Sequence, residues 1–328
     1  MKKILLVVVF IVLSILAVRL ILKTQSYSVS EVFSDFPQSS RVFNSVSSTT
    51  ITAIVPKKGS AVDAPEKGIK QLYGTKNGGR TWQSAWDGGT QRALRSGQKD
   101  PLDPEFVARG NGVVSIDGRG VAQIKGDTPR MYVYDSSSTK KKWNDIEVTI
   151  YAKRVSETEQ KSSQGIVIGA RSEHQDAGES PCAGRTYYAR MLYDGRVVFQ
   201  KELIHSDIYS SNQPGENHKV DWGTVDRKMP KNVWIGMKFV VKTRDDGRAV
   251  DLKIFRDLTD GKDGGAWEKV AEYADEGNWP QIHKNIDVQK RCGFSAKQIL
   301  TEPATSVFVR NDAISNMQYK LFSIREIK

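Results

Sequence analysis

Short stretches in which apolar and polar residues alternate recur from about residue 70 to the end of the chain. The clearest are residues 146–152, 165–171, 233–243, 249–256 and 307–310, with Asp-Gly or Gly-Gly pairs between or beside them. This pattern is typical of β-strands joined by tight turns. No stretch keeps a helical period for three turns. Many strands without alternating helices predict an all-β fold, a two-sheet antiparallel β-sandwich.

The sharpest hairpin prediction covers residues 185–203, where two β-rich segments are joined at Asp194-Gly195. An Asp-Gly pair supplies the positive φ angles of a two-residue type I′ turn. We therefore expect Tyr193 to pair with Arg196, a register that places two aromatic rings and two cations on one face. These residues are Tyr188, Arg190, Phe199 and Lys201. Such a mixed face suits a sugar or an acidic polymer better than a dry core.

Alternation within residues 165–174 places Ile166 and Ile168 toward the core and Arg171 and Glu173 on the opposite face. Two interpretations are open. One is a cross-strand ion pair on a solvated sheet, worth about 1 kcal/mol or less. The other places Arg171 and Glu173 beside the mixed face of the hairpin, as the polar floor of a binding groove.

The N-terminus begins Met1-Lys2-Lys3 and continues with an apolar run to residue 22, interrupted by Arg19. This run has about 19 residues, close to the roughly 20 that span a bilayer. It predicts a membrane anchor over residues 1–23, with the basic end in the cytoplasm and the rest of the chain outside. The alternative is a cleaved signal peptide and a secreted protein. Residues 24–67 are rich in Ser, Thr and Pro and predict a polar stalk, followed by one domain over residues 68–328.

The formal net charge is +11, and its cations are scattered along the chain. The densest run, Lys140-Lys-Lys142, follows a Ser-rich turn and is typical of a solvated loop. Outside the cytoplasm, a positive field favours anionic polysaccharide or anionic lipid as a partner. No nucleic-acid-binding motif accompanies the charge, so we expect no nucleic-acid partner.

Cysteine and metal chemistry are limited by composition. The chain has two cysteines, Cys182 and Cys292, and outside the cytoplasm a disulfide between them is plausible. The alternative is two unpaired buried thiols. Neither the cysteines nor the histidine spacing predicts a zinc site, and no metal ligands are assigned. An Asp-rich turn at residues 257–263 could hold a structural calcium ion.

Four segments carry a family resemblance. They are Tyr187-Tyr-Ala-Arg-Met-Leu-Tyr-Asp-Gly-Arg196, Phe199-Gln-Lys-Glu202 with His205, Val233-Trp-Ile-Gly-Met-Lys238, and Tyr319-Lys-Leu-Phe-Ser-Ile-Arg-Glu-Ile327. Together, over about residues 70 to 327, they resemble the concanavalin A-like jelly-roll superfamily, in particular its poorly characterised surface proteins. The resemblance implies a jelly roll whose concave sheet commonly holds carbohydrate, in lectins, in glucanases or in polysaccharide lyases.

Catalytic motifs of that superfamily are matched only in part. The laminarinase-type triplet Glu-x-Asp-x-x-Glu does not occur in the sequence. Of the alginate-lyase-type motifs, Arg171-Ser-Glu-His174 resembles the first and Gln281-Ile-His283 the second, while the third is missing. In those enzymes, cations and an amide neutralise the substrate carboxylate while a Tyr or His removes a proton.

The leading hypothesis is a membrane-anchored domain outside the cytoplasm that recognises a polysaccharide, either neutral or anionic, on one sheet face and requires no cofactor. The candidates for substrate binding are Arg171, Glu173, Arg190, Lys201 and Glu202. The alternative is a polysaccharide lyase, favoured over a glycoside hydrolase, in which Tyr188, His174 or His205 transfers a proton. A third hypothesis is a structural surface or adhesion subunit without a glycan ligand.

Overall fold

The computed structural model describes most of the chain beyond residue 67. The described residues are 68–137, 140–161, 164–176, 180–205, 208–212, 218–279, 288–295 and 297–328. The predicted anchor and stalk lie outside these residues, and so does the tripeptide Gln281-Ile-His283. None of the helices within the described ranges is long and apolar enough to cross a membrane.

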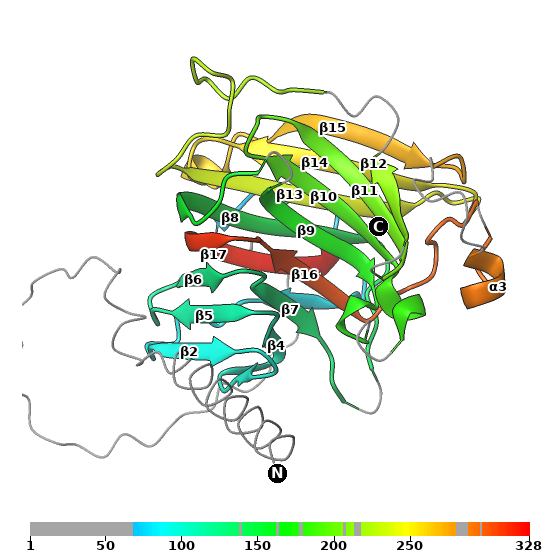
Figure 1. Ribbon diagram of the computed structural model, residues 1–328, viewed down its shortest axis with the longest axis horizontal. Coiled ribbons are helices and arrows are strands. Elements are labelled where there is room, and N and C mark those ends of the chain that lie inside the picture. Colours follow the sequence, from blue (N-terminus) through cyan, green and yellow to red (C-terminus); the bar gives the residue numbers. More distant parts are fainter. Residues whose placement is uncertain are drawn as a thin grey trace, which may run out of the picture. The chain divides into compact units, whose positions relative to one another are not determined.

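The described residues form two antiparallel β-sheets, stacked as two layers in Figure 1. This confirms the predicted all-β sandwich. The eight-stranded sheet has the order β12 (Ile208–Asn212), β11 (Val197–Ile204), β10 (Thr186–Leu192), β9 (Gly165–Ser172), β16 (Ser306–Arg310), β7 (Arg130–Tyr134), β4 (Asp103–Arg109) and β3 (Lys99–Asp100). The nine-stranded sheet has the order β15 (Glu268–Asp275), β14 (Val250–Asp257), β13 (Trp234–Thr243), β8 (Ile146–Glu157), β17 (Ile314–Glu326), β6 (Val121–Gly126), β5 (Gly112–Ile116) and β2 (Arg92–Arg95), and β1 (Thr81–Gln83) pairs with β17.

The main core lies between the sheets, where alternate side chains of each strand meet. Strand β13 shows the pattern, because four of its residues at every second position belong to this core: Ile235, Met237, Phe239 and Val241. The five strands predicted most clearly from alternation correspond to β8, β9, β13, β14 and β16. Two-residue periodicity was sufficient to find them because each has one face in the core.

The described helical segments are short and lie outside the sheets. They are η2 (His174–Asp176), η3 (Pro181–Gly184), η4 (Lys262–Gly264) and α3 (Val288–Cys292). Cys182 in η3 and Cys292 at the end of α3 form a disulfide that joins segments 110 residues apart. This bond fixes α3 near the end of the eight-stranded sheet where β9 gives way to β10.

The β10–β11 hairpin forms, but its predicted register is wrong by one residue. Leu192 N donates to Arg196 O at 2.8 Å, and Gly195 N donates to Leu192 O at 3.0 Å, so three residues make the turn. The resulting ladder pairs Tyr187 with Lys201, Tyr188 with Gln200, Ala189 with Phe199 and Arg190 with Val198. A shift of one residue moves side chains to the opposite face. Lys201 and Phe199 therefore lie on the face opposite to Tyr188 and Arg190.

Candidate functional site

A row of arginines crosses the outer face of the eight-stranded sheet. Cross-strand pairing connects Arg190 of β10 with Val167 of β9, then Arg310 of β16, Arg130 of β7 and Arg109 of β4. Their neighbours along each strand, such as Met191, Val309 and Met131, belong to the core between the sheets. Because successive side chains of a strand point to opposite faces, the arginines point outward. We call Arg109, Arg130, Arg190 and Arg310 the arginine row.

An aromatic row runs parallel to it, two residues along each strand. Tyr188, Phe308 and Tyr132 occupy successive positions across the sheet, with Gly169 between the first two and Val107 beyond the last. Tyr132 stacks on Phe308 with ring centroids 4.7 Å apart, and Tyr188 meets Phe308 edge-on at 5.8 Å. Together with Val107 and Val167 they form a buried cluster separate from the main core. The aromatic row is thus a rigid, buried floor of this sheet face, and its rings are not exposed for a ligand to stack on.

The arginine row is half-buried and well positioned. Arg109 donates to Tyr134 Oη at 3.0 Å, Arg130 donates to Thr128 O at 3.0 Å, and Arg190 donates to Gln200 Oε1 at 2.7 Å. The Nε atoms of Arg109 and Arg130 are buried and have no hydrogen-bond partner among the residues described. A buried donor without a partner costs free energy, so these two Nε atoms mark places where the arginine row is incompletely satisfied within the described residues.

Burial and the closeness of like charges change the pKa of a member of the arginine row. Arg310 pairs with Asp312 at 2.5 Å. Burial, with the charge of Arg310, lowers the pKa of Arg190 to about 10. Arg190 therefore keeps its charge at neutral pH, but the cost of holding it beside Arg310 would be relieved by a bound anion.

Two histidines, a glutamate and two tyrosines meet where β9 and β11 end. The hydroxyl of Tyr188 donates to Glu202 Oε2, and Glu202 Oε1 lies 3.0 Å from His205 Nδ1. Tyr132 Oη lies 2.9 Å from His174 Nδ1, and His174 Nε2 lies 3.8 Å from Glu202 Oε2. We call His174, Glu202 and His205 the His–Glu cluster. It adjoins the aromatic row through both tyrosines.

The cluster comes from the ends of β9 and β11, the two strands that flank β10. His174 begins η2, separated by one residue from the end of β9, while Glu202 lies in β11 and His205 directly follows that strand. Burial, with the charges of His205 and nearby arginines, lowers the pKa of His174 to about 3, so its imidazole is neutral at neutral pH. Burial and the carboxylate of Glu202 raise the pKa of Tyr188 well above its usual value.

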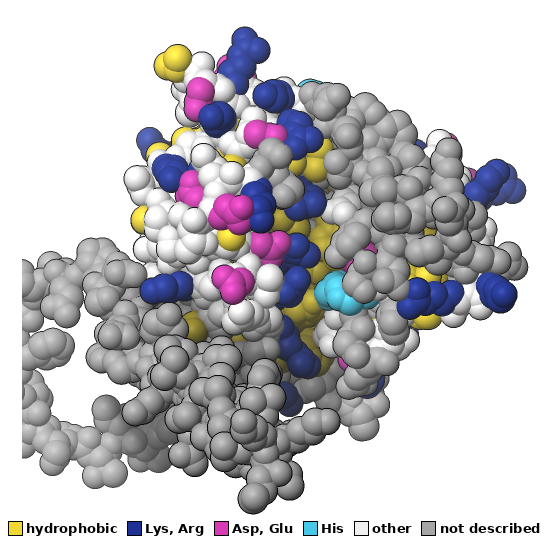
Figure 2. All heavy atoms as spheres, in the orientation of Figure 1, with side chains coloured by type: hydrophobic (Ala, Val, Ile, Leu, Met, Phe, Trp, Pro, Cys, Tyr) yellow, Lys and Arg dark blue, Asp and Glu magenta, His cyan; other side chains and the backbone are white. Residues whose placement is uncertain are grey.

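The space-filling view shows this side of the molecule (Figure 2). Lys and Arg side chains form a line along a hollow that is floored by hydrophobic surface, and histidine surface lies beside that line. His205 is the accessible member of the His–Glu cluster, with 30% of its side chain exposed, whereas Glu202 is fully buried. An incoming ligand would therefore meet the arginine row and His205 first.

The predicted site residues are partly brought together. Tyr188, Glu202, His174 and His205 lie in contact, and Arg190 belongs to the adjoining arginine row. Glu173 is half-buried and accepts a hydrogen bond from Thr305 Oγ1 at 2.6 Å, with Arg185 at 3.4 Å. It lies in the segment between β9 and η2 rather than in either row.

Lys201 does not lie on the predicted face. Its Nζ donates to Asp275 Oδ2 at 2.8 Å and to Gln298 O at 2.6 Å, and the side chain is buried. The shifted hairpin register is the cause, because it turns Lys201 toward the other sheet.

Arg171 is also misplaced by the sequence prediction. A register irregularity interrupts the pairing of β9 with β16, and Arg171 has a φ of +51°, so strict alternation ends before it. Its buried guanidinium donates to Asp145 Oδ1 at 2.6 Å, to Thr243 Oγ1 at 2.7 Å and to Leu300 O at 3.0 Å. Arg171 therefore fastens loops at one end of the sandwich.

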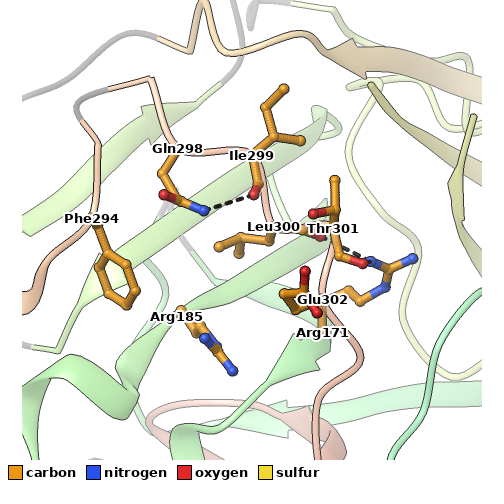
Figure 3. Close-up of a pocket in the computed structure, with 8 residues that line it drawn as sticks. All are labelled: Arg171, Arg185, Phe294, Gln298, Ile299, Leu300, Thr301 and Glu302. Carbon is orange, nitrogen blue, oxygen red and sulfur yellow. Dashed lines mark hydrogen bonds between the residues drawn. The ribbon is translucent and has the colours of Figure 1, made fainter. Parts of the chain in front are cut away.

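A small pocket opens beside Arg171, and Figure 3 shows its lining, which consists of Phe294, residues 298–302, Arg171 and Arg185. The Arg171 guanidinium points at the backbone of Thr301, to which it donates. Gln298 Nε2 likewise donates to Ile299 O at 3.0 Å. The polar groups here hold the chain segment itself, so the pocket is a weaker site candidate than the arginine row.

The Asp-rich turn at residues 257–263 is held by hydrogen bonds to the carboxylate of Asp257. Asp257 accepts from Tyr151 Oη at 2.8 Å and from the backbone N atoms of Thr259, Gly261 and Ala266 at 2.9 to 3.0 Å. Its carboxylate is thus already surrounded by donors. Within the described residues, this turn contributes no group of three potential metal ligands.

Sequence reasoning missed Arg109, Arg130 and Arg310 as well as Tyr132. Each lies in a recognisable strand, but in segments separated by up to 200 residues, and only the strand order of the sheet aligns them. The available signal was an arginine at the end of each alternating run, as in Phe308-Val-Arg310.

Comparisons with known proteins found no matching family model and no matching curated protein. The solved structures that match include concanavalin A-like jelly-roll proteins, among them lectins, receptor-binding domains of botulinum neurotoxins and an alginate lyase. The receptor-binding domain of botulinum neurotoxin D is 9% identical with a TM-score of 0.36, covering 75% of this chain and 50% of that one, so the chain spans half of its length. The exoplasmic/lumenal domain of VIP36, in a Ca²⁺/Man2-bound form, is 8% identical with a TM-score of 0.38, covering 75% and 89%.

Alginate lyase vAL-1 from Chlorella virus is 15% identical with a TM-score of 0.32, covering 68% of this chain and 94% of that one. At these identities and TM-scores, the similarities do not bear on ligand or activity. The evidence for a function therefore comes from the side chains of this protein alone.

Proposed function

We propose that the domain binds an anionic polysaccharide, such as a polyuronate, along the arginine row. The observation that carries this is the alignment of four outward arginines in one cross-strand register beside a buried aromatic floor. Neighbouring strands are roughly 4.8 Å apart, so a row over five strands extends about 19 Å. That length suits several units of an extended polymer better than a single sugar.

Guanidinium groups bind carboxylates through paired, charge-assisted hydrogen bonds, which explains the choice of an acidic partner. A rigid floor reduces the conformational entropy that the arginines lose on binding. The proposed setting is outside the cytoplasm, with residues 1–23 as the membrane anchor. The disulfide between Cys182 and Cys292 supports an oxidising compartment.

The test is calorimetric titration of the full-length protein with a polyuronate and with a neutral glucan. The variant is Arg109→Gln/Arg130→Gln, which removes the two cations with unpartnered Nε atoms. The matched control is Arg248→Gln/Lys262→Gln, which removes the same charge from exposed positions elsewhere. We expect polyuronate binding to weaken at least tenfold in the first variant and to be unchanged in the control. Equal binding of the neutral glucan, or equal loss in both variants, would contradict the proposal.

A second candidate function is polysaccharide lyase activity, favoured by the position of the His–Glu cluster beside the row. In β-elimination, a base removes the proton from the carbon next to the carboxylate, the bond from the adjacent carbon to the glycosidic oxygen breaks, and a carbon–carbon double bond forms. The departing oxygen takes up a proton from the protonated base or from water, which gives a hydroxyl end. His205 is the accessible candidate for the base, and Glu202 would stabilise its protonated form. Tyr188 and His174 are buried and would position this pair.

Release of unsaturated product from polyuronate, followed by its ultraviolet absorbance, tests this second candidate. His205→Ala should abolish product formation while polyuronate binding persists. Tyr188→Phe should reduce the rate by loosening Glu202. If the unaltered protein binds polyuronate but releases no unsaturated product, the binding function stands and the lyase function is excluded.

A further inference from the structure

We propose that His174, Glu202 and His205 bind a divalent transition-metal ion of the Zn²⁺ class. Among the side chains described, these three are the one group of at least three potential metal ligands. One donor atom from each lies within 4.8 Å of the other two. The cluster is separate from the arginine row, so this inference goes beyond the proposed polysaccharide binding. It is an alternative to the lyase role of His205, because the metal would take the Nδ1 atom that contacts Glu202 in that role.

The geometry needs only a small contraction to close around a metal. His205 Nδ1 lies 3.0 Å from Glu202 Oε1, and His174 Nε2 lies 3.8 Å from Glu202 Oε2. With metal–ligand bonds of roughly 2.0 to 2.1 Å, tetrahedral donors stand about 3.4 Å apart. The two histidines contact different oxygens of Glu202, and one donor atom from each of the three residues lies within 4.8 Å of the others, so the side chains must move inward to reach that spacing. The rings of His174 and His205 meet edge-on with centroids 4.4 Å apart, so both can present a nitrogen to one point.

The surroundings provide the outer hydrogen bonds that metal ligands usually have. His174 Nδ1 is engaged by Tyr132 Oη at 2.9 Å, which leaves Nε2 for a metal. Glu202 Oε2 accepts from Tyr188, which fixes the carboxylate plane. Such outer partners set the tautomer of a ligating histidine and orient ligating carboxylates. Tyr132 and Tyr188 both belong to the aromatic row, so a packed floor supports the site.

Donor chemistry selects the class of ion. Two imidazoles with one carboxylate suit Zn²⁺, Co²⁺, Ni²⁺ or Cu²⁺, whereas Ca²⁺ takes six to eight oxygen ligands. Ligation requires His205 in the tautomer that carries its proton on Nε2, leaving the Nδ1 lone pair for the metal. Three protein ligands leave a fourth position for water or an anionic group. The partial exposure of His205 provides the entry path.

The test is calorimetric titration of the tag-free, full-length protein with ZnCl₂ after treatment with a chelator, in the absence of polysaccharide. We expect one Zn²⁺ per chain and no competition from excess Ca²⁺. His205→Ala and Glu202→Gln should each weaken binding at least tenfold. The matched control is His218→Ala, which removes an exposed histidine outside the cluster and should change nothing.

A second readout keeps the test decisive if a variant folds poorly. Co²⁺ bound by the unaltered protein should give the visible absorption of a low-coordinate nitrogen–oxygen site, and one equivalent of Zn²⁺ should remove it. Absence of saturable Zn²⁺ binding, absence of the Co²⁺ spectrum, or equal loss in His218→Ala would overturn the proposal. Because no glycan is present, these outcomes are independent of whether the arginine row binds polyuronate.

Discussion

Gly169 in β9 makes room for the central ring of the aromatic row. A Cβ at this position would lie 2.4 Å from two ring carbons of Phe308, closer than any real contact. The ring is fully buried and meets Tyr132 and Tyr188, so it has little room to move. We expect Gly169→Ala to lower the free energy of unfolding by about 1 to 3 kcal/mol, the usual cost of overpacking. Urea unfolding, monitored by tryptophan fluorescence, measures this change in the free energy of unfolding.

Gly74→Ala is the matched control for this substitution. Its added Cβ would meet Lys328 Cδ at 3.7 Å, an ordinary contact. The free energy of unfolding should therefore stay within about 0.5 kcal/mol of the unaltered protein. Equal effects of the two substitutions would show that crowding at Phe308 is not the cause.

Asp103 makes stability depend on pH in a definite direction. Burial raises its pKa to about 6, although it accepts hydrogen bonds from Glu105 N and from Trp82 Nε1. Between the unfolded pKa near 4 and the folded pKa, the folded state holds more protons than the unfolded state. The stabilising contribution is therefore present below about pH 4 and is lost as pH rises through 6, with a slope of at most about 1.4 kcal/mol per pH unit.

Asp103→Asn tests this pH dependence because an amide can still accept from Trp82 and does not titrate. Relative to this variant, the unaltered protein should lose about 1 to 3 kcal/mol of unfolding free energy between pH 4 and pH 6. Urea unfolding at half-unit intervals of pH measures the difference. Parallel curves for the two proteins would mean that Asp103 is not protonated in the folded state.

Two residues, Arg171 and Lys201, show where the sequence predicted the wrong face of a strand. Alternation correctly assigned Ile166 and Ile168 to the core, but it failed at Arg171, where the irregular register turns the side chain inward. The Asp194-Gly195 pair correctly located a hairpin, but the turn took three residues, and Lys201 changed face as a result. A bulge or an added turn residue depends on tertiary pairing, which local patterns do not encode.

At the scale of elements, alternation predicted several strands, including β9, β10 and β16, but neither β4 nor β7, and it did not predict which strands are neighbours. The arginine row draws on β4, β7, β10 and β16, and the partners of β16 in the sheet are β7 and β9. The hairpin between β10 and β11 is local, whereas the β7–β16 pairing spans most of the domain. Tyr188, Glu202 and His205 come from the local hairpin and its end, but the predicted register put Glu202 on the face opposite to Tyr188, and only the observed register brings them together.

The disulfide is the element-scale link with the clearest energetic consequence. It attaches α3 to η3 across 110 residues, and a crosslink over a loop of that size restricts the unfolded chain strongly. We expect Cys182→Ser/Cys292→Ser to lower the free energy of unfolding by about 2 to 4 kcal/mol. Urea unfolding under oxidising conditions measures the loss.

A reducing agent provides the internal comparison for this prediction. It should lower the stability of the unaltered protein by a similar amount and leave the double variant unchanged. If reduction has no effect on the unaltered protein, the bond does not stabilise the fold. The double variant avoids the free thiol that a single substitution would leave.

At the scale of the whole molecule, charge and specificity are separate properties. The net charge of +11 attracts any polyanion at low salt, with a range set by a Debye length of about 10 Å at 0.1 M ionic strength. Aligned guanidinium groups add directional hydrogen bonds that salt weakens less. Polyuronate binding that persists at higher salt and disappears in Arg109→Gln/Arg130→Gln would distinguish the arginine row from this general field.

The order of the strands makes the C-terminal segment essential to the whole fold. Strand β17 pairs with β8 on one side and with β6 and β1 on the other, and it supplies Met317 and Tyr319 to the core. A chain that ends after Arg310 would leave unpaired edges in the middle of a sheet. We expect it to lack cooperative unfolding and near-ultraviolet circular dichroism, whereas removal of exposed Lys328 alone should preserve both. Cooperative unfolding of the chain truncated after Arg310 would mean that the two sheets can close without their central strand.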